Sequence, residues 1–187
     1  IMVPKKRYFG NSVLSAMTKV ASGYWSVSDT QTGYTAISLS ALNAIDLYDI
    51  YHTYGVPNDI LIKLNIARCT LREIPIKPVY AVGEQSKMKI GKVIPTVSWL
   101  LIKGFFKRIT KKYLLNDFHP IFLFYFLGLI ASLAGLYFLI CIIYGLAADV
   151  TISLGTYLGF VSLLVASFVF VGFAMWFDVY DNERLQR

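Results

Sequence analysis

Charged residues and cysteines are scarce in this 187-residue sequence. Charged side chains make up 16% of it, whereas about a quarter is usual in a soluble domain, which argues against an ordinary cytosolic globule. The two cysteines, Cys69 and Cys141, are too few for a disulfide framework and are expected to be ordinary buried thiols. Intrinsic disorder is excluded because 16% of the residues are aromatic. What remains is a basic, largely apolar chain, 56% hydrophobic with a net charge of +7.

Two long runs of the sequence contain no charged residue. They extend over residues 120–148 and 150–177, and only Asp149 separates them. A helix of about 20 apolar residues crosses the hydrocarbon core of a bilayer, where every backbone polar group must be bonded within its own segment. We therefore predict membrane helices at about 121–146 and 154–177, in a transmembrane hairpin with a short cytosolic tail over residues 116–187. Small residues along both runs would permit a homo-oligomer.

Basic residues gather just before the first of these runs. Between residues 87 and 112 there are eight lysines or arginines and no acid. The positive-inside rule then predicts an integral membrane protein with a cytosolic amino-terminal region, in a prokaryotic cell membrane or, in a eukaryote, the endoplasmic reticulum. Nucleic acid is not expected as a partner, because the basic cluster adjoins a membrane span.

Residues 93–115 mix these cations with aromatic residues such as Trp99, Phe105 and Phe106. This mixture is typical of an amphipathic segment that lies in the membrane interface, with its apolar face in contact with lipid. The alternative is a basic amphipathic helix packed on the cytosolic region.

Residues 1–92 have a mixed helix and strand pattern. Helices are predicted at 11–21, at 41–48 with Ser38 or Ser40 as N-cap, and from Asn58 or Asp59 to Ala67. Short strands are predicted at 35–38 and 71–76. The expected fold class is thus α/β plus transmembrane helices. So few strand signals suggest the carboxy-terminal half of a larger domain, and because the sequence begins with Ile1 and Met2, we expect it to be a piece of a longer protein.

Two polar loops contain the main candidate site residues. Asp29 and Gln31 stand just before Gly33, in a loop where a carboxylate can lie beside a ligand. In the second loop, Ser86 and Lys87 offer a hydroxyl and an ammonium group that can bind phosphate together with backbone amides. The alternatives are a turn capped by Asp29 and a solvated basic loop.

A third candidate is the basic run Lys5, Lys6 and Arg7, which could bind an acidic ligand or lipid or simply be a solvated chain start. His52 and His119 are too far apart in sequence to indicate a metal site. His119 and Pro120 instead mark the start of the first membrane helix. The sequence has no HExxH, paired CxxC, GxGxxG, Walker or GxSxG motif.

The order of several segments along the chain is also informative. They are Arg7 to Leu14, Thr18 with Lys19, Asp29 to Tyr34, Asn58 to Asn65, Pro75 to Tyr80, Gln85 to Lys87, Asn116 to Pro120, the two apolar runs, and Ala174 to Asp178. Together they resemble the acceptor-side half of glycosyltransferase family 2 enzymes that act on polyprenyl phosphates. The most similar group is the dolichyl-phosphate mannose or glucose synthase-like transferases, particularly archaeal ones. The resemblance covers essentially the whole chain.

The resemblance implies a GT-A catalytic domain, of which residues 1–92 would be the carboxy-terminal half. It implies a nucleotide sugar as donor, a polyprenyl or dolichyl phosphate as acceptor, and Mg²⁺ or Mn²⁺ held by an Asp-x-Asp motif in the first half of the domain. This sequence has no Asp-x-Asp, since the pairs Asp46/Asp49 and Asp178/Asp181 are one residue too far apart. We therefore expect no metal ligand in this chain, a donor-binding half outside it, and no activity from the fragment alone.

The resemblance also implies roles for individual residues. Asp29 matches the family's acidic motif and would orient the acceptor or a metal-bound water, with Gln31 as a polar neighbour. Ser86 and Lys87 match the loop that closes over the donor phosphates. The acceptor phosphate would be met by two cations, Arg7 and Lys19.

Two other functions fit the same sequence. One is a non-catalytic two-helix membrane anchor or scaffold whose cytosolic region binds a partner. The other is a transferase that extends a lipid-linked saccharide; its acceptor is a hydroxyl, so Asp29 would be a true general base. The sugar, the nucleotide and the lipid length do not follow from the sequence.

Overall fold

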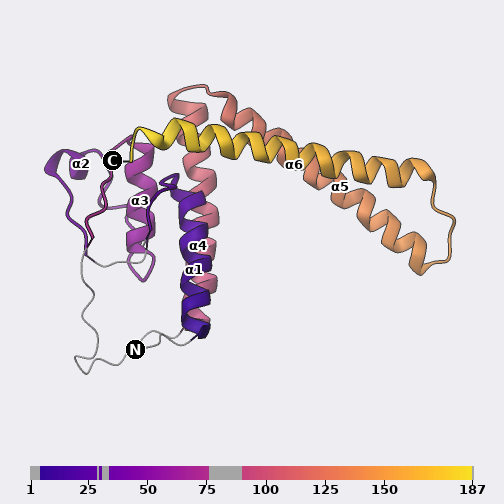
Figure 1. Cartoon of the computed structure of the whole chain (residues 1–187), viewed down its shortest axis with the longest axis horizontal. Helices are drawn as coiled ribbons and strands as arrows, with labels where there is room; N and C mark the ends of the chain where they lie inside the picture. The colour runs from indigo at the N-terminus through magenta and orange to yellow at the C-terminus, as the bar shows by residue number, and fades with distance from the viewer. Residues whose placement is uncertain (1–4, 29, 31–33, 76–89, 187) are drawn as a thin grey trace. The chain divides into compact units, whose positions relative to one another are not determined.

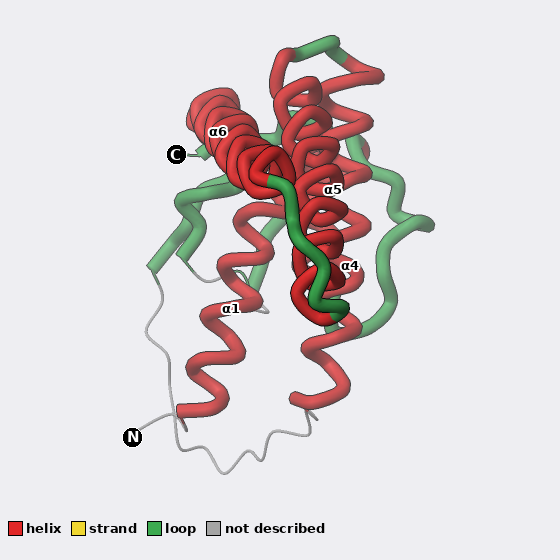
Figure 2. Tube along the Cα trace, turned by 90° about the vertical axis from the view of Figure 1, so that its right-hand side faces the viewer, coloured by secondary structure: helices red, strands yellow, loops and turns green. Residues whose placement is uncertain are grey.

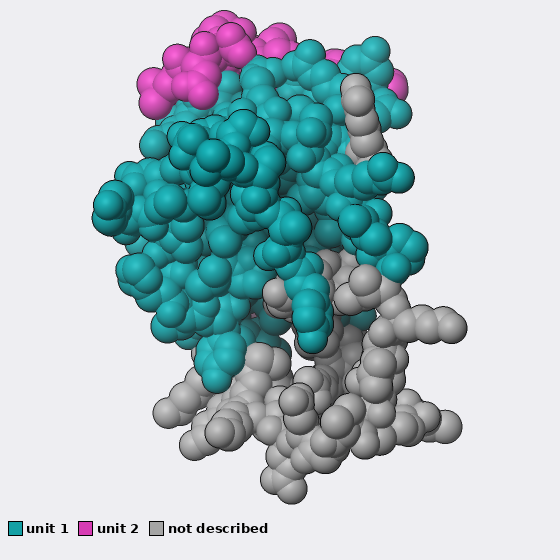
Figure 3. Space-filling model, turned by 90° about the vertical axis from the view of Figure 1, so that its left-hand side faces the viewer, with its two compact units in different colours: residues 1–112, 179–187 teal, residues 113–178 magenta. Residues whose placement is uncertain are grey.

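The computed structural model describes residues 5–28, 30, 34–75 and 90–186, and these are mostly helical (Figure 1). In chain order the helices are α1 (Lys5–Ser22), α2 (Leu39–Asn43), α3 (Val56–Ile66), α4 (Ile90–Thr110), the π-helical turn η1 (Lys111–Asn116), α5 (Pro120–Ala147) and α6 (Leu154–Glu183). The chain divides into two compact units, coloured separately in Figure 3. Unit 1 consists of residues 1–112 and 179–187, and unit 2 of residues 113–178.

The prediction of an α/β region is wrong for the described residues, which contain helices and loops but no strand (Figure 2). Residues 35–38 belong to no strand. Of the predicted strand 71–76, Leu71 makes a single isolated bridge to Gln186, and Ile76 lies outside the described residues. One bridge to a residue so remote in sequence supplies no second strand, and a sheet needs several paired strands to be stable.

The predicted helices are confirmed with shifted ends. Helix α1 contains the predicted 11–21. Ser38 is the N-cap of α2, since its hydroxyl accepts a hydrogen bond from the Ala41 N–H. That helix is shorter than predicted, and the carboxylate of Asp46 instead accepts from the Tyr48 N–H in a turn. Helix α3 begins earlier than predicted because Pro57 occupies its first turn, where a missing N–H costs nothing.

Unit 1 is built around three helices, α1, α3 and α4, which pack against one another. Their shared core is a cluster of buried apolar side chains: Leu14, Ala21, Ile62, Val97 and Leu101. A second cluster includes Tyr24, Val27, Ile45, Leu64 and also Leu185, which follows α6. Unit 1 therefore contains chain from both before and after the two apolar helices.

Helices α5 and α6 are long and apolar enough to cross a membrane. Of the most apolar 18-residue stretch of each, only 17% and 11% is buried, so neither packs as a core helix within the described part of the chain. The prediction of two long apolar helices is confirmed. Helix α6 continues beyond the predicted end at Phe177 to Glu183, so its last turns also include charged residues. His119 is the N-cap of α5, as its ring Nδ1 accepts from the Ile121 N–H.

Close packing joins the two long helices within unit 2. Gly128 of α5 approaches Val171 of α6 so closely that an added Cβ would lie 2.8 Å from a Val171 methyl group. One turn further along α5, the Ser132 and Ser167 hydroxyls are 2.6 Å apart, and Gly159 of α6 approaches Phe138. Positions later in α5 meet positions earlier in α6, so the pair is antiparallel.

Candidate functional site

Most of the residues predicted for the site fall outside the part of the chain that the structure describes. Asp29, Gln31, Ser86 and Lys87 are among them. Arg7 lies in α1, although only its backbone is described. The sixth, Lys19, lies half-buried in the last turn of α1. The phosphate-binding roles of Ser86 and Lys87 therefore stay predictions.

The neighbours of Asp29 on both sides are described, and each makes contacts with a remote part of unit 1. Thr30 is buried, and its hydroxyl donates to the Ser15 hydroxyl of α1 at 3.4 Å. The backbone N–H and hydroxyl of Ser28 donate to the two carboxylate oxygens of Glu73, at 2.7 and 3.0 Å. The chain on either side of Asp29 is thus held between α1 and the segment that follows α3.

Ser15 and Lys19 are four residues apart on α1, so they lie on the same face of that helix. The structure thus brings the chain next to Asp29 to the face of α1 that carries Lys19. The contact itself joins Thr30 and Ser15, whereas Asp29 lies outside the described residues. Sequence reasoning did not include Ser15, Ser28 or Glu73, because isolated serines and a lone glutamate form no motif.

A buried polar cluster that the sequence analysis missed lies elsewhere in unit 1. Lys112 of η1 has no exposed surface, and its Nζ donates to Asn65 of α3 at 3.0 Å and to Asn182 of α6 at 2.6 Å. Asp181 supplies a carboxylate 3.3 Å from the same nitrogen. A buried charge is tolerated only with such partners, so this cluster joins α3 and η1 to the end of α6.

Arg108 is a second fully buried cation. Its guanidinium donates to the carbonyls of Val20 and Ala21, at 3.0 and 2.9 Å, in the last turn of α1. These carbonyls have no partner within the helix, and a cation there also interacts favourably with the helix dipole. Gly23 follows with φ +77°, and a side chain at this position would collide with Arg108. The arginine therefore caps α1 and is not available to a phosphate ligand.

A third polar group lies around Asp49 and combines the exposed Asp49 and Lys107 with the buried Lys63 and Asp59. Lys107 is 2.6 Å from the Asp49 carboxylate and Lys63 is 3.6 Å from it. Lys63 also pairs with Asp59 at 2.6 Å, one turn earlier on α3. The hydrogen bond and charge of Lys107, and then the charge of Lys63, lower the pKa of Asp49 below its ordinary value of 3.8. All four groups neutralise one another, which is typical of a structural network.

Tyr24 and Cys69 form a further buried contact. The Tyr24 hydroxyl donates to the Cys69 carbonyl at 2.6 Å. Burial raises the pKa of Tyr24 well above its usual range, and the neighbouring Cys69 adds to the effect. Burial also raises the pKa of the Cys69 thiol. A raised pKa disfavours the nucleophilic thiolate. Cys69 and Cys141 are both free and half-buried, whereas buried thiols were expected.

Helix α4 has two different faces. Val97, Leu101 and Ile109 are buried, two of them in the core shared with α1 and α3. Trp99, Ile102 and Phe106 are 62%, 43% and 51% exposed, and the Lys103 ammonium lies 6.0 Å from the Trp99 ring. The packing of α4 on the rest of unit 1, which was the alternative expectation, is therefore present. The apolar residues of its other face are left exposed beside a lysine.

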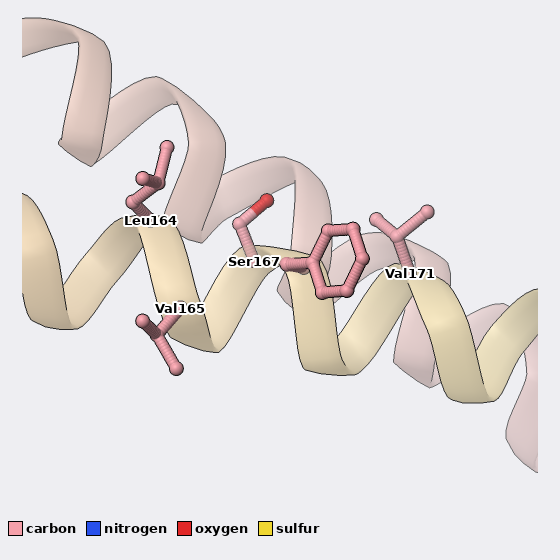
Figure 4. Close-up of a pocket in the computed structure, with 5 residues that line it drawn as sticks. Leu164, Val165, Ser167 and Val171 are labelled. Atoms are coloured by element: carbon pink, nitrogen blue, oxygen red, sulfur yellow. The ribbon is translucent and has the colours of Figure 1, made fainter.

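A shallow hollow of about 500 Å³ in unit 2 is lined by residues of α6 (Figure 4). Its lining is Leu164, Val165, Ser167, Phe168 and Val171. Ser167 supplies the only polar side chain, and its hydroxyl is bonded to Ser132 and to the Gly128 carbonyl of α5. A hollow with so apolar a lining is suited to hydrocarbon chains and not to a polar substrate.

No group of three or more His, Cys, Asp or Glu side chains that could hold a metal ion occurs among the described residues. The Mg²⁺ or Mn²⁺ implied by the resemblance therefore has no ligand set in this part of the chain. Comparison with known protein families, curated proteins and solved structures finds no match to the chain.

Proposed function

We propose that this chain is the acceptor-side part of a membrane-bound glycosyltransferase that moves a hexose from a nucleotide sugar to a polyprenyl phosphate. The observation that carries the proposal is the contact between Thr30 and Ser15. It holds the chain beside Asp29 against the face of α1 that carries Lys19, and these are the two segments to which the sequence resemblance assigns the acceptor. The reaction class itself rests on that resemblance.

Two properties of the described residues suit a lipid acceptor. Helices α5 and α6 are long enough to span a bilayer, and unit 1 contains residues from before and after them. Both flanks of the hairpin would then lie on one side of the membrane, which the basic residues predict to be the cytosolic side. The exposed face of α4, with Trp99, Phe106 and Lys103, would lie in the interface among anionic head groups.

The chemistry asks little of a general base. A polyprenyl phosphate is already anionic at neutral pH, so catalysis consists of positioning it and of stabilising the diphosphate that leaves. Asp29 and Gln31 would orient the acceptor, whereas Arg7 and Lys19 would balance its charge. The divalent metal would neutralise the donor diphosphate, and its ligands are expected outside this chain.

The test is transfer of labelled hexose to polyprenyl phosphate by the full-length natural protein in lipid nanodiscs. The protein's intact mass is measured first, because the proposal needs a mass well above the 21.1 kDa of this chain. Lys87→Ala should lower kcat/KM about 100-fold, the effect of removing one cation from a developing anionic charge. Lys111→Ala, which removes an exposed lysine of η1, is the matched control and should leave transfer unchanged.

Three results would revise the proposal in different ways. Unchanged transfer in Lys87→Ala would exclude its phosphate role. Transfer only to a lipid-linked saccharide, abolished in Asp29→Asn, would identify the hydroxyl-acceptor enzyme instead. A natural protein of about 21.1 kDa without transfer from any nucleotide sugar would favour the membrane anchor or scaffold.

A further inference from the structure

Residues 24–30 are held by hydrogen bonds at every second position. Tyr24 donates to the Cys69 carbonyl, Ser28 donates to Glu73, and Thr30 donates to Ser15. The fourth anchor is at Ser26, whose backbone N–H and hydroxyl both donate to the side-chain oxygen of Gln186, each at 2.5 Å. Gln186 lies 160 residues away in sequence, after α6.

The segment that presents Gln186 is itself firmly held in unit 1. Leu185 is buried in the second core cluster, and its carbonyl accepts from the Leu71 N–H at 2.8 Å. The Gln186 amide group donates to the Asn182 carbonyl at 3.1 Å. Asn182 has no exposed surface and is bonded through its side chain to Lys112 and Asn65. Gln186 is thus attached to a buried scaffold and can position what it binds.

We infer that Gln186 is a positioning residue for the acceptor loop, acting through Ser26 on the segment that carries Asp29. The inference rests on the proposed function for the role of Asp29, and on the two hydrogen bonds from Ser26 to Gln186 for the anchor itself. It assigns a role in the reaction to the chain that follows the second apolar helix. An ordered acceptor site would then require that the segment after α6 packs on unit 1.

The first experiment measures the anchor without any assay of activity. Amide hydrogen exchange is followed in the full-length protein in nanodiscs for wild type, Gln186→Ala and the control Arg184→Ala. Arg184 is largely exposed and only pairs with Asp181. Gln186→Ala should speed exchange in residues 24–30 about fivefold, the value of one ordinary hydrogen bond, and leave α1 and α3 unchanged. Unchanged exchange in residues 24–30, or faster exchange throughout unit 1, would overturn the positioning role.

The second experiment measures steady-state transfer with the same proteins. Gln186→Ala should lower kcat about fivefold without changing the KM for the nucleotide sugar, since the donor site lies elsewhere. Gln186→Glu keeps an oxygen acceptor for Ser26 and should restore kcat. Ser26→Ala removes the same hydroxyl contact, so its effect should not add to that of Gln186→Ala.

These outcomes separate the inference from the proposed function. If the wild-type protein transfers no sugar, the proposed function fails, whatever the exchange data show. If it is active and Gln186→Ala loosens residues 24–30 while the kinetics stay the same, only the positioning role is overturned.

Discussion

The contacts inside unit 1 differ in kind from the contacts inside unit 2. In unit 1 the cations of Arg108 and Lys112 are fully buried, and backbone carbonyls, side-chain amides and a carboxylate surround them. Unit 2 joins its long helices through glycine, serine and aromatic contacts, while large apolar side chains cover its outer surface. Buried polar groups thus characterise unit 1, and close contacts between helices characterise unit 2.

This difference in packing is the one expected between a region surrounded by water and a helix pair surrounded by lipid. In water, burial of apolar surface already drives helices together, so buried polar groups add specificity about which surfaces meet. In lipid the chains around a helix are as apolar as the helix itself. Association must then come from close packing of small residues and from a few hydrogen bonds between helices. Substitutions matched across the two units can test this contrast.

The largest effect is expected at Lys112. Lys112→Met keeps most of the side-chain volume but leaves Asp181, Asn65 and Asn182 without this donor, and should destabilise unit 1 by about 3–5 kcal/mol. Denaturant unfolding in detergent, read by hydrogen exchange in α1 and α3, measures it. Lys111→Met, an exposed neighbour, should be nearly neutral. Equal effects of the two substitutions would mean that burial of the charge does not matter.

The next effect is expected in unit 2, where space is limiting. Gly128→Ala places a methyl group 2.8 Å from Val171 and should destabilise the helix pair by about 1–3 kcal/mol. Gly172→Ala is the matched control, because nothing lies within 4 Å of its added Cβ. Thermal unfolding of the hairpin in detergent compares them. If the control is as damaging as Gly128→Ala, close approach is not what joins the helices.

A smaller effect is expected for the hydroxyl pair between α5 and α6. Ser167→Ala removes its bonds to Ser132 and to the Gly128 carbonyl and should cost about 0.6 kcal/mol, the average for such bonds in membranes. The control is Ser162→Ala, because Ser162 is exposed and donates only within its own helix. A loss above that of Gly128→Ala would show that hydrogen bonds, and not packing, dominate unit 2.

The smallest effect concerns the exposed carboxylate of Asp49, which pairs with Lys107 and Lys63. Lys107 lowers the pKa of Asp49 in the folded state below the ordinary pKa of 3.8. The ion pair therefore stabilises the fold above pH 3.8, and this stabilisation is lost as the pH falls through the lower pKa of the folded state. The side chain is 56% exposed, so screening leaves about 0.3 kcal/mol. Asp49→Asn should therefore reduce stability slightly at pH 7 and not at all at the lowest pH. About 1 M salt should remove the difference.

Local patterns in the sequence predicted the helices better than they predicted the rest of the fold. The N-cap at Ser38 or Ser40, the helix at 11–21 and the start of the first apolar helix at His119 depend on neighbouring residues. The structure confirms the last two and selects Ser38 as the N-cap. The strands at 35–38 and 71–76 are wrong or unsupported because a strand exists only with a partner. Leu71 finds that partner in Gln186, which no local pattern indicates.

The candidate site divides in the same way. The sequence indicated Asp29 through its motif-like loop, but the residues that hold that loop were not foreseen. Ser15, Glu73 and Gln186 each come from a different part of the chain. The role of such isolated polar residues becomes visible only in the folded chain, where they form hydrogen bonds with the same segment.

The two apolar helices follow from local sequence alone, because a run of about 20 apolar residues without charge is long enough to span a bilayer whatever surrounds it. Which cations are buried depends on the fold. Lys111 and Lys112 are adjacent and chemically identical, yet one is exposed and the other has no accessible surface. The difference lies in Asn65 and Asn182, which meet Lys112 from positions 47 residues before it and 70 after it. Burial of a charge depends on partners gathered from distant parts of the chain, and no local pattern records them.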